Sequence, residues 1–378
     1  MDRHASGESS ISKGSDGRWH GYVSMGLKDG GRRDRRHVAS ASRAEVVRQV
    51  RVLEDQREEG VVLVGGRSIT VEQWMTLWLD TIAARKVRPS TLVGYRTCLR
   101  RVNEQLGHHR LDRLQPEHLE RFYTRLEADG LSPTTALLHH RVISRALKVA
   151  MQPGRVARNV ATLVDAPTAR HEEIEPLTNG EARRLLDAAR ELPNGARWSV
   201  ALALGLRQGE ALGLLWDAVD LDAGTLTVRL ALQRQKGKGL VLVPPKSRAG
   251  RRTIKLPDQL TEALRAHRAL QRERRMAAAN VWEDRGFVFC QADGRPIDAR
   301  RDWQDWKALL QAAGVRDARL HDARHTAATI LLQQGVPARV AMQILGHSQI
   351  TLTLGTYSHV VPELAQEAAD RIGIALWS

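Results

Sequence analysis

The sequence predicts a multidomain protein with a small N-terminal module, an all-α domain and a mixed α+β domain, in that order. The length of 378 residues is sufficient for two or three domains with cores of their own. The hydrophobic period changes along the chain, from short alternating segments to helical spacing and then to a mixture of both. A polar segment bounded by prolines separates the second part from the third, which indicates a linker.

The N-terminal module, residues 1–64, has the pattern of a three-stranded β-sheet followed by one helix. Glycines interrupt the alternation, and the strands are expected at residues 9–13, 18–25 and 33–39. A helix from residue 42 to about residue 59 should follow. So small a module is only marginally stable by itself. Four arginines flank one turn of this sheet, where they could contact base edges in a major groove of DNA, and they are Arg32, Arg33, Arg35 and Arg36.

The second part, residues 65–166, is expected to be entirely helical. Thr70 and Gln73 form a capping box ahead of an apolar helical face. Further helices are expected to start at Pro116 and Pro133, because proline is favoured at the first helical position. Gly107 stands where a glycine often ends a helix. Residues 167–176 then form the linker.

The third part, residues 177–378, combines helices with short strands. Leu226, Val228, Leu230 and Leu232 alternate with other residues, which predicts one half-buried strand. Two more strands, at residues 240–246 and 251–256, are expected to form a hairpin around a turn at residues 247–250.

Charge and composition narrow the class of partner. Lys and Arg number 58 against 43 Asp and Glu, a net charge of +15, which suits a polyanion. The two cysteines, Cys98 and Cys290, lie far apart and exclude a disulfide framework or zinc-finger pattern. The N-terminus lacks an apolar signal segment, and no apolar run is long enough to span a bilayer. A cytoplasmic protein without a membrane partner is therefore expected.

Two short motifs each place a cation three residues from a second polar side chain. In GLRQGEALGLLW, Arg207 precedes Glu210, so the carboxylate can orient the guanidinium. In LHDARHTAATILLQQG, His321 precedes Arg324 at the start of a helix, where the positive end of the dipole favours a phosphate. A third motif, LGHSQITLTLGTYSHV, contains His347 and Tyr357. Tyr357 is the only tyrosine after Tyr123.

A basic stretch lies between the first two motifs. From Arg229 to Lys255 there are nine Lys or Arg and no acidic residue, which suggests contacts with DNA phosphates. The candidates for such contacts are Lys236, Lys238, Arg248, Arg251 and Arg252. Lys246, at the expected turn, is placed to reach into a site.

Phosphodiester transfer without a metal needs cations around the phosphate, a nucleophile and a proton donor for the leaving oxygen. The motifs supply cations and one phenol, whereas the sequence has no Cys/His ligand set. No metal and no cofactor are therefore expected.

The ordered set G-L-R-x-G-E, K, H-x-x-R-H, L-G-H-S and T-Y-S-H-V resembles the tyrosine recombinases, the phage integrase family, over residues 177–361. The resemblance implies a core-binding role for the helical domain and a catalytic role for the third. Arg207 and Arg324 would clamp the scissile phosphate, with Glu210 supporting the site.

The resemblance also assigns the proton transfers and the nucleophile. Tyr357 would become joined to the 3′ phosphate of DNA, and His321 would accept or return its proton. Lys246 would protonate the leaving 5′ oxygen, with Lys236 and Lys238 as rivals for this role. His347 would donate a second hydrogen bond to the phosphate. The phosphotyrosyl bond preserves the energy of the ester, so religation needs no ATP.

The implied activity is site-specific recombination by a homotetramer, through a Holliday junction. The N-terminal module resembles the arm-binding domain of integrases, so the DNA partner would be attachment sites with core and arm parts. A directionality factor and a DNA-bending host protein are possible further partners. The tail, residues 362–378, is expected to contact a neighbouring protomer.

Other functions remain open on the sequence. An Xer-like resolvase would need no arm module, and a type IB topoisomerase would share the chemistry without exchanging strands. A regulator that binds DNA but has lost catalysis is disfavoured by the complete set of motif residues. An RNA-binding protein is disfavoured because aromatic residues make up only 4% of the chain and no stacking motif is present.

Overall fold

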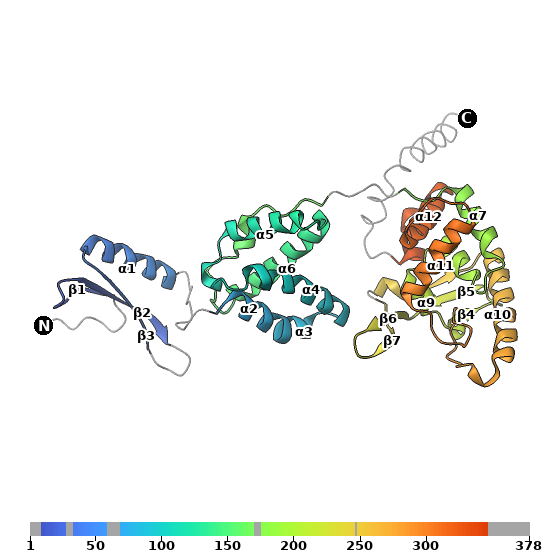
Figure 1. The fold of residues 1–378 in the computed structure, drawn as a ribbon, viewed down its shortest axis with the longest axis horizontal. Helices are drawn as coiled ribbons and strands as arrows, with labels where there is room; N and C mark the ends of the chain where they lie inside the picture. The colour runs from blue at the N-terminus through green and yellow to red at the C-terminus, as the bar shows by residue number, and fades with distance from the viewer. Residues whose placement is uncertain (1–8, 28–32, 59–68, 170–174, 246–247, 347–378) are drawn as a thin grey trace, which may run out of the picture. The chain divides into compact units, whose positions relative to one another are not determined.

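The computed structural model describes residues 9–27, 33–58, 69–169, 175–245 and 248–346 (Figure 1). The chain divides into two compact units, Met1–His171 and Glu172–Ser378. Within the described ranges, no helix combines the length and the apolar character that crossing a bilayer requires.

The N-terminal segment forms the expected sheet and helix. The strands β1 (Ser10–Lys13), β2 (Trp19–Leu27) and β3 (Arg33–Ser40) pair antiparallel in that order, and α1 (Arg43–Glu58) follows. A small core joins Val23 and Met25 of the sheet to α1. Gly21 allows the close approach of the helix, because a Cβ there would lie 2.5 Å from a methyl group of Val50.

The rest of the first unit is helical, as the period predicts. Its elements are α2 (Val71–Leu77), a π-helical turn η1 (Trp78–Ala83), α3 (Ala84–Lys86), α4 (Pro89–Leu106), α5 (Pro116–Ala128) and α6 (Pro133–Met151). The capping box of Thr70 and Gln73 is present, and so is proline at the start of α5 and α6. Trp74 lies in the core and donates a hydrogen bond to the carbonyl of Ala146 at 3.1 Å.

Gly107 ends α4, as its position in the sequence suggests, and its backbone there is right-handed (φ −58°, ψ −32°). The reason is that its N–H continues the helical pattern by donating to Asn103 at 3.0 Å.

The second unit is a mixed α+β domain. Its helices are α7 (Asn179–Ala189), α8 (Ala196–Leu204), α9 (Gln208–Leu212), α10 (Asp258–Ala278), α11 (Ala299–Ala312), α12 (Leu320–Gln333) and α13 (Ala338–Leu345). Its strands are β4 (Val219–Asp220), β5 (Thr225–Val228), β6 (Ala231–Gln235), β7 (Gly239–Val243) and β8 (Arg252–Lys255). In Figure 1 the strands β6 and β7 lie at one edge of this unit and α10 at the other.

Strand pairing in this unit differs from the expectation. The alternating segment that begins at Leu226 is not one strand: β5 belongs to a sheet of order β4-β5-β8, and among the described strands β6 pairs with β7 alone. The hairpin expected between residues 240–246 and 251–256 is therefore wrong. Pro244 and Pro245 end β7, since proline lacks the N–H that a strand ladder needs. The turn of the actual hairpin is at residues 236–238.

Candidate active site

The first motif forms a tight ion pair at the start of α9. Arg207 is the residue that precedes the helix, and its Nη1 atom lies 2.7 Å from Oε1 of Glu210. The second carboxylate oxygen accepts the backbone N–H of Arg207 at 3.2 Å. Glu210 is 4% exposed, whereas the Arg207 side chain is 41% exposed. The pair therefore presents a fixed cation to solvent, as the spacing predicted.

Arg252 is the second partner of Glu210. Its Nη2 atom lies 3.2 Å from Oε2 of the carboxylate, and the side chain is only 7% exposed. It also donates to the carbonyls of Ile344 at 2.6 Å and Gly250 at 3.0 Å. Burial lowers the pKa of Arg252 below its usual range, while Glu210 opposes that shift. Arg252 thus faces inward and holds the site together, and it does not lie with the exposed basic residues of its stretch.

The second motif lies in the first turns of α12. Arg324 is buried (3% exposed), and its Nη1 atom donates to the carbonyl of Gly205 at 2.6 Å. Gly205 stands two residues before Arg207, so this bond connects the two motifs. Arg207 in turn donates from Nη2 to the carbonyl of Gly346 at 2.9 Å, directly before His347 in the chain.

Glycine is required at positions 205 and 346 of this arrangement, because both residues have left-handed backbone, with φ of 58° and 70°. A Cβ at Gly205 would lie 2.6 Å from Leu345 and 3.2 Å from Ala327. A Cβ at Gly346 would lie 2.7 Å from the Arg252 guanidinium. Each glycine therefore ends a helix and leaves room for an arginine or its neighbours. We call Arg207, Glu210, Arg252 and Arg324, with the carbonyls they contact, the arginine network.

His321 stands in the first turn of α12, beside this network. Burial of the ring, together with the positive charges of Arg324 and Arg207, lowers the pKa of His321 below 6.5 against the opposing charge of Asp322. Part of the side chain is nevertheless exposed. A neutral, accessible imidazole beside two arginines is suited to accept a proton near a phosphate.

His325 lies one turn further along α12. The two imidazole rings meet edge to face, with centroids 5.0 Å apart and planes at 84°. Burial and the neighbouring His321 lower the pKa of His325 to about 4. Both histidines are thus neutral at pH 7.

Some residues of the basic stretch form ion pairs within the protein, and others are exposed to solvent. Arg229 pairs with Asp217, and Arg234 pairs with Asp298 at 2.7 Å. Lys236 and Lys238, at the turn between β6 and β7, are exposed, as is Arg251. The backbone of Arg248 begins a short 3₁₀ turn, Arg248–Gly250.

Several predicted residues lie outside the described ranges. These are Lys246, His347, Tyr357, Arg32 and the tail, residues 362–378. The arginines of β3 are separated by the alternation of the strand. Arg35 is exposed, with its guanidinium 5.0 Å from the centroid of the Tyr22 ring. Arg36 is on the opposite face and pairs with buried Asp34 at 3.6 Å.

Two features of the site were not predicted from the sequence. Arg252 is one of nine cations in its stretch, and its sequence position offers no sign that it points inward. The left-handed glycines were detectable in principle, since Gly205 and Gly346 each follow an apolar helical run.

Comparison with known proteins places the chain in a family. The model of the phage integrase family matches residues 175–363, half of the chain, and an N-terminal SAM-like domain model of phage integrases matches residues 70–126. An integrase of Saccharopolyspora erythraea is 40% identical, covering 99% of this chain and 98% of that protein. A tyrosine recombinase XerC-like protein of Caldanaerobacter subterraneus is 28% identical over 81% of this chain and 83% of its own.

Solved structures show the same fold. The Tn1549 transposon integrase in complex with a circular intermediate DNA superposes with a TM-score of 0.69 at 23% identity, covering 81% of this chain and all of that one. A lambda integrase dimer bound to a core site gives a TM-score of 0.56 at 14% identity, over 92% of this chain and 93% of that one.

The cationic site and the fold together define a DNA strand transferase of the tyrosine recombinase class. The chain belongs to the phage integrase family. The family match includes the sequence positions of Lys246, His347 and Tyr357, and site-specific recombination is the activity that follows.

Proposed function

We propose that this recombinase integrates and excises a mobile DNA element, and that the arginine network holds the scissile phosphate. The observation that carries the proposal is the connection of Arg324 to the Arg207 motif through Gly205, because it brings both motif arginines to one place. Two fixed guanidiniums can stabilise the charge that develops on the equatorial oxygens of a phosphate.

The chemical step uses residues of this chain alone. The hydroxyl oxygen of Tyr357 attacks phosphorus, and its proton passes to neutral His321. The bond from phosphorus to the 5′ oxygen breaks, and Lys246 gives that oxygen a proton. His347 donates a hydrogen bond to the phosphate. The 3′-phosphotyrosyl bond is later attacked by the 5′ hydroxyl of another strand, which restores the phenol and joins the strands.

The domain roles form the second part of the proposal. Residues 65–166 bind the core site, residues 177–378 catalyse, and residues 1–64 bind separate arm sites. A tetramer on two duplexes exchanges strands, assisted by a directionality factor and a DNA-bending host protein. Support comes from the integrase that is 40% identical over nearly the whole of both chains, including the segment of the N-terminal sheet.

The nucleophile is tested with a nicked suicide substrate carrying the core site. The wild-type protein should accumulate a covalent adduct that mass spectrometry maps to Tyr357. Tyr357→Phe should bind the same DNA with near-normal affinity and form no adduct, because one oxygen is lost from a protein with many phosphate contacts. Adduct formation by the Phe variant would refute the assignment.

An Xer-like resolvase is the second candidate, favoured by the relative that is 28% identical. Removal of residues 1–60 discriminates between the two functions. For an arm-binding integrase, the truncated protein should still cleave a short core site but lose recombination of full attachment sites. An unchanged footprint and unchanged recombination would favour the resolvase.

A further inference from the structure

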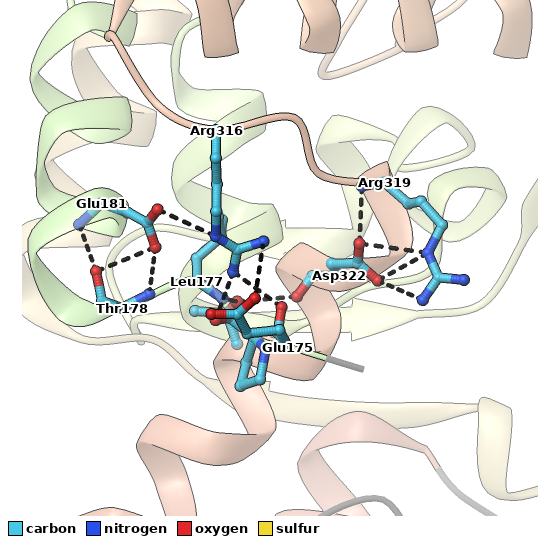
Figure 2. A network of polar contacts seen from close by, with 9 residues as sticks. Glu175, Leu177, Thr178, Glu181, Arg316, Arg319 and Asp322 are labelled. Atoms are coloured by element: carbon cyan, nitrogen blue, oxygen red, sulfur yellow. Dashed lines mark hydrogen bonds and ion pairs between the residues drawn. The ribbon is translucent and has the colours of Figure 1, made fainter. Parts of the chain in front are cut away.

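The end of the linker is fastened to the catalytic domain by one arginine (Figure 2). Arg316 precedes α12, and its Nη2 atom donates to the carbonyl of Glu175 at 3.0 Å and to that of Pro176 at 2.9 Å. These two carbonyls belong to the last two residues of the linker, only four and five positions beyond His171, where the first unit ends. Arg316 therefore holds the chain at the point where it enters the second unit.

A second contact binds the next residue directly to α12. The backbone N–H of Leu177 donates to the hydroxyl of Thr326 at 2.9 Å, and that hydroxyl donates to the carbonyl of Asp322 at 2.9 Å. Thr326 is fully buried and Leu177 is 3% exposed. Leu177 also shares a hydrophobic cluster with Ala323 of α12. The hydroxyl thus joins the linker end to the helix that carries His321 and Arg324.

Arg316 is itself held in place. Its Nε atom lies 3.2 Å from Glu181, whose carboxylate accepts the backbone N–H of Thr178 at 2.8 Å. Partial burial raises the pKa of Glu181, but the hydrogen bonds from Thr178 and the charge of Arg316 outweigh it and keep the pKa below 4.5. Glu181 is therefore ionised at neutral pH, where its ion pair with Arg316 is present.

The start of α12 is equally fixed. Asp322 accepts the backbone N–H of Arg319 at 2.7 Å and pairs with its guanidinium at 3.0 Å. Both ends of the short segment 316–319 are thus tied, one to the linker end and the other to the first turn of α12 (Figure 2). A displacement of the linker end would therefore be transmitted, through hydrogen bonds and a few residues of backbone, to His321 and Arg324.

We propose that Arg316 and Thr326 are positioning residues, which anchor the linker end to α12 so that DNA engagement by the helical domain sets His321 and Arg324 for strand cleavage. This inference rests on the function proposed above. It adds that DNA binding by the helical domain is coupled to cleavage by the catalytic domain. The physical basis is the contiguous set of hydrogen bonds, which can bias the placement of the first turn of α12.

The test separates DNA binding from cleavage in the full-length protein. Arg316→Gln should bind a core-site duplex with unchanged Kd but cleave the suicide substrate at least about tenfold more slowly in a single turnover. Thr326→Val should behave alike, and Thr326→Ser, which keeps the hydroxyl, should restore cleavage. Arg190→Gln is the matched control, because Arg190 forms an exposed pair with Asp187 in the same unit.

A lengthened linker distinguishes coupling from a purely structural role. Four glycines inserted after His171 should slow cleavage by a similar factor, and combination with Arg316→Gln should add little, because both changes interrupt the same route. The proposal is wrong if the combined protein loses cleavage by the product of the two single factors. It is also wrong if Arg316→Gln weakens DNA binding and lowers thermal stability in proportion to its loss of cleavage, because the anchor would then serve stability alone.

Hydrogen exchange gives a readout that does not depend on catalysis. Core-site DNA should slow amide exchange at residues 320–326 in the wild-type protein and do so less in Arg316→Gln. Equal protection in both proteins would overturn the coupling even if the wild type forms the Tyr357 adduct. Absence of any adduct with differing protection would instead contradict the proposed chemistry and leave the anchor supported.

Discussion

The arginine network and the β6–β7 hairpin use the same kind of charge in opposite ways. In the network, Glu210 bridges Arg207 and Arg252, and backbone carbonyls fix the guanidiniums. At the tip of the hairpin, Lys236 and Lys238 are exposed to solvent. A cation that must sit within hydrogen-bond distance of a transition state is held rigidly, whereas one that only attracts phosphates can remain mobile.

The difference predicts which losses are chemical and which are electrostatic. Removing a fixed group should leave its partners buried and unpaired, with a large cost in cleavage or stability. Removing a solvated lysine should change only the affinity for DNA and its dependence on salt. The following experiments test this division, in decreasing order of expected effect.

Loss of the general acid should give the largest effect. Lys246→Ala should slow cleavage of normal DNA by about 10²–10⁴-fold, the usual contribution of general acid catalysis. A substrate with sulfur as the 5′ bridging atom should restore most of the rate, since a thiolate leaves without a proton. Arg207→Ala is the control and should show no such rescue. If the sulfur substrate instead rescues Lys236→Ala or Lys238→Ala, the general acid lies in the β6–β7 turn.

Glu210→Gln should disrupt the network itself. The change removes the negative charge between two arginines, one of them buried, and should destabilise the protein by about 3 kcal/mol while slowing cleavage severalfold more than binding. Glu283→Gln, at an exposed pair with Arg285, is the matched control and should cost less than about 1 kcal/mol. Chemical denaturation and single-turnover cleavage measure the two effects. Equal stability of the two variants would show that Glu210 does not act as the bridge.

The sequence predicted the network only in part. Arg207 with Glu210 and His321 with Arg324 were recognisable, because a spacing of three residues places two side chains on one helical face. The role of Arg252 was not, since its inward direction depends on contacts with Ile344 and Gly346, which are distant in the chain.

The strand pairing shows the same limit. Alternation identified the strand residues near Leu226 and Leu232, but it carries no information about which strand is the neighbour. Next to the break between β5 and β6, Gly209 of α9 and Gly213, which caps that helix, allow the helix to lie against the backbone of Leu232. A close approach of this kind is a tertiary property. Local elements were therefore predictable, and their partners were not.

Lowering the pH should reduce the stability of the protein through His325, which lies next to His321 on α12. The pKa of His325 falls to about 4 in the folded protein, against 6.5 for an ordinary histidine. Between these values the unfolded chain binds more protons, so stability should be greatest above pH 6.5 and decline as pH falls towards 4. Because the ring is only partly buried and solvent screens its charge, the total loss should be less than the full shift implies, about 1–3 kcal/mol. Denaturant titrations at several pH values measure the slope, and His325→Gln should reduce it. A slope identical in both proteins would assign the effect to other groups.

The hairpin lysines should give the smallest effect. Lys236→Ala and Lys238→Ala each remove one solvated charge, so binding to core-site DNA should weaken severalfold and the salt dependence of log K should fall by about 0.9 for each lysine that contacts a phosphate. Cleavage at saturating protein should stay at the wild-type rate. Lys255→Ala is the control, because the ammonium of Lys255 donates to the carbonyl of Ala223 and is engaged with the protein. Its removal lowers the net charge equally but should leave the salt slope unchanged. Equal slopes for the three variants would mean that net charge, and not contact at the hairpin tip, sets the affinity. The contrast between the fixed arginine network and the exposed hairpin lysines would then not hold for the lysines.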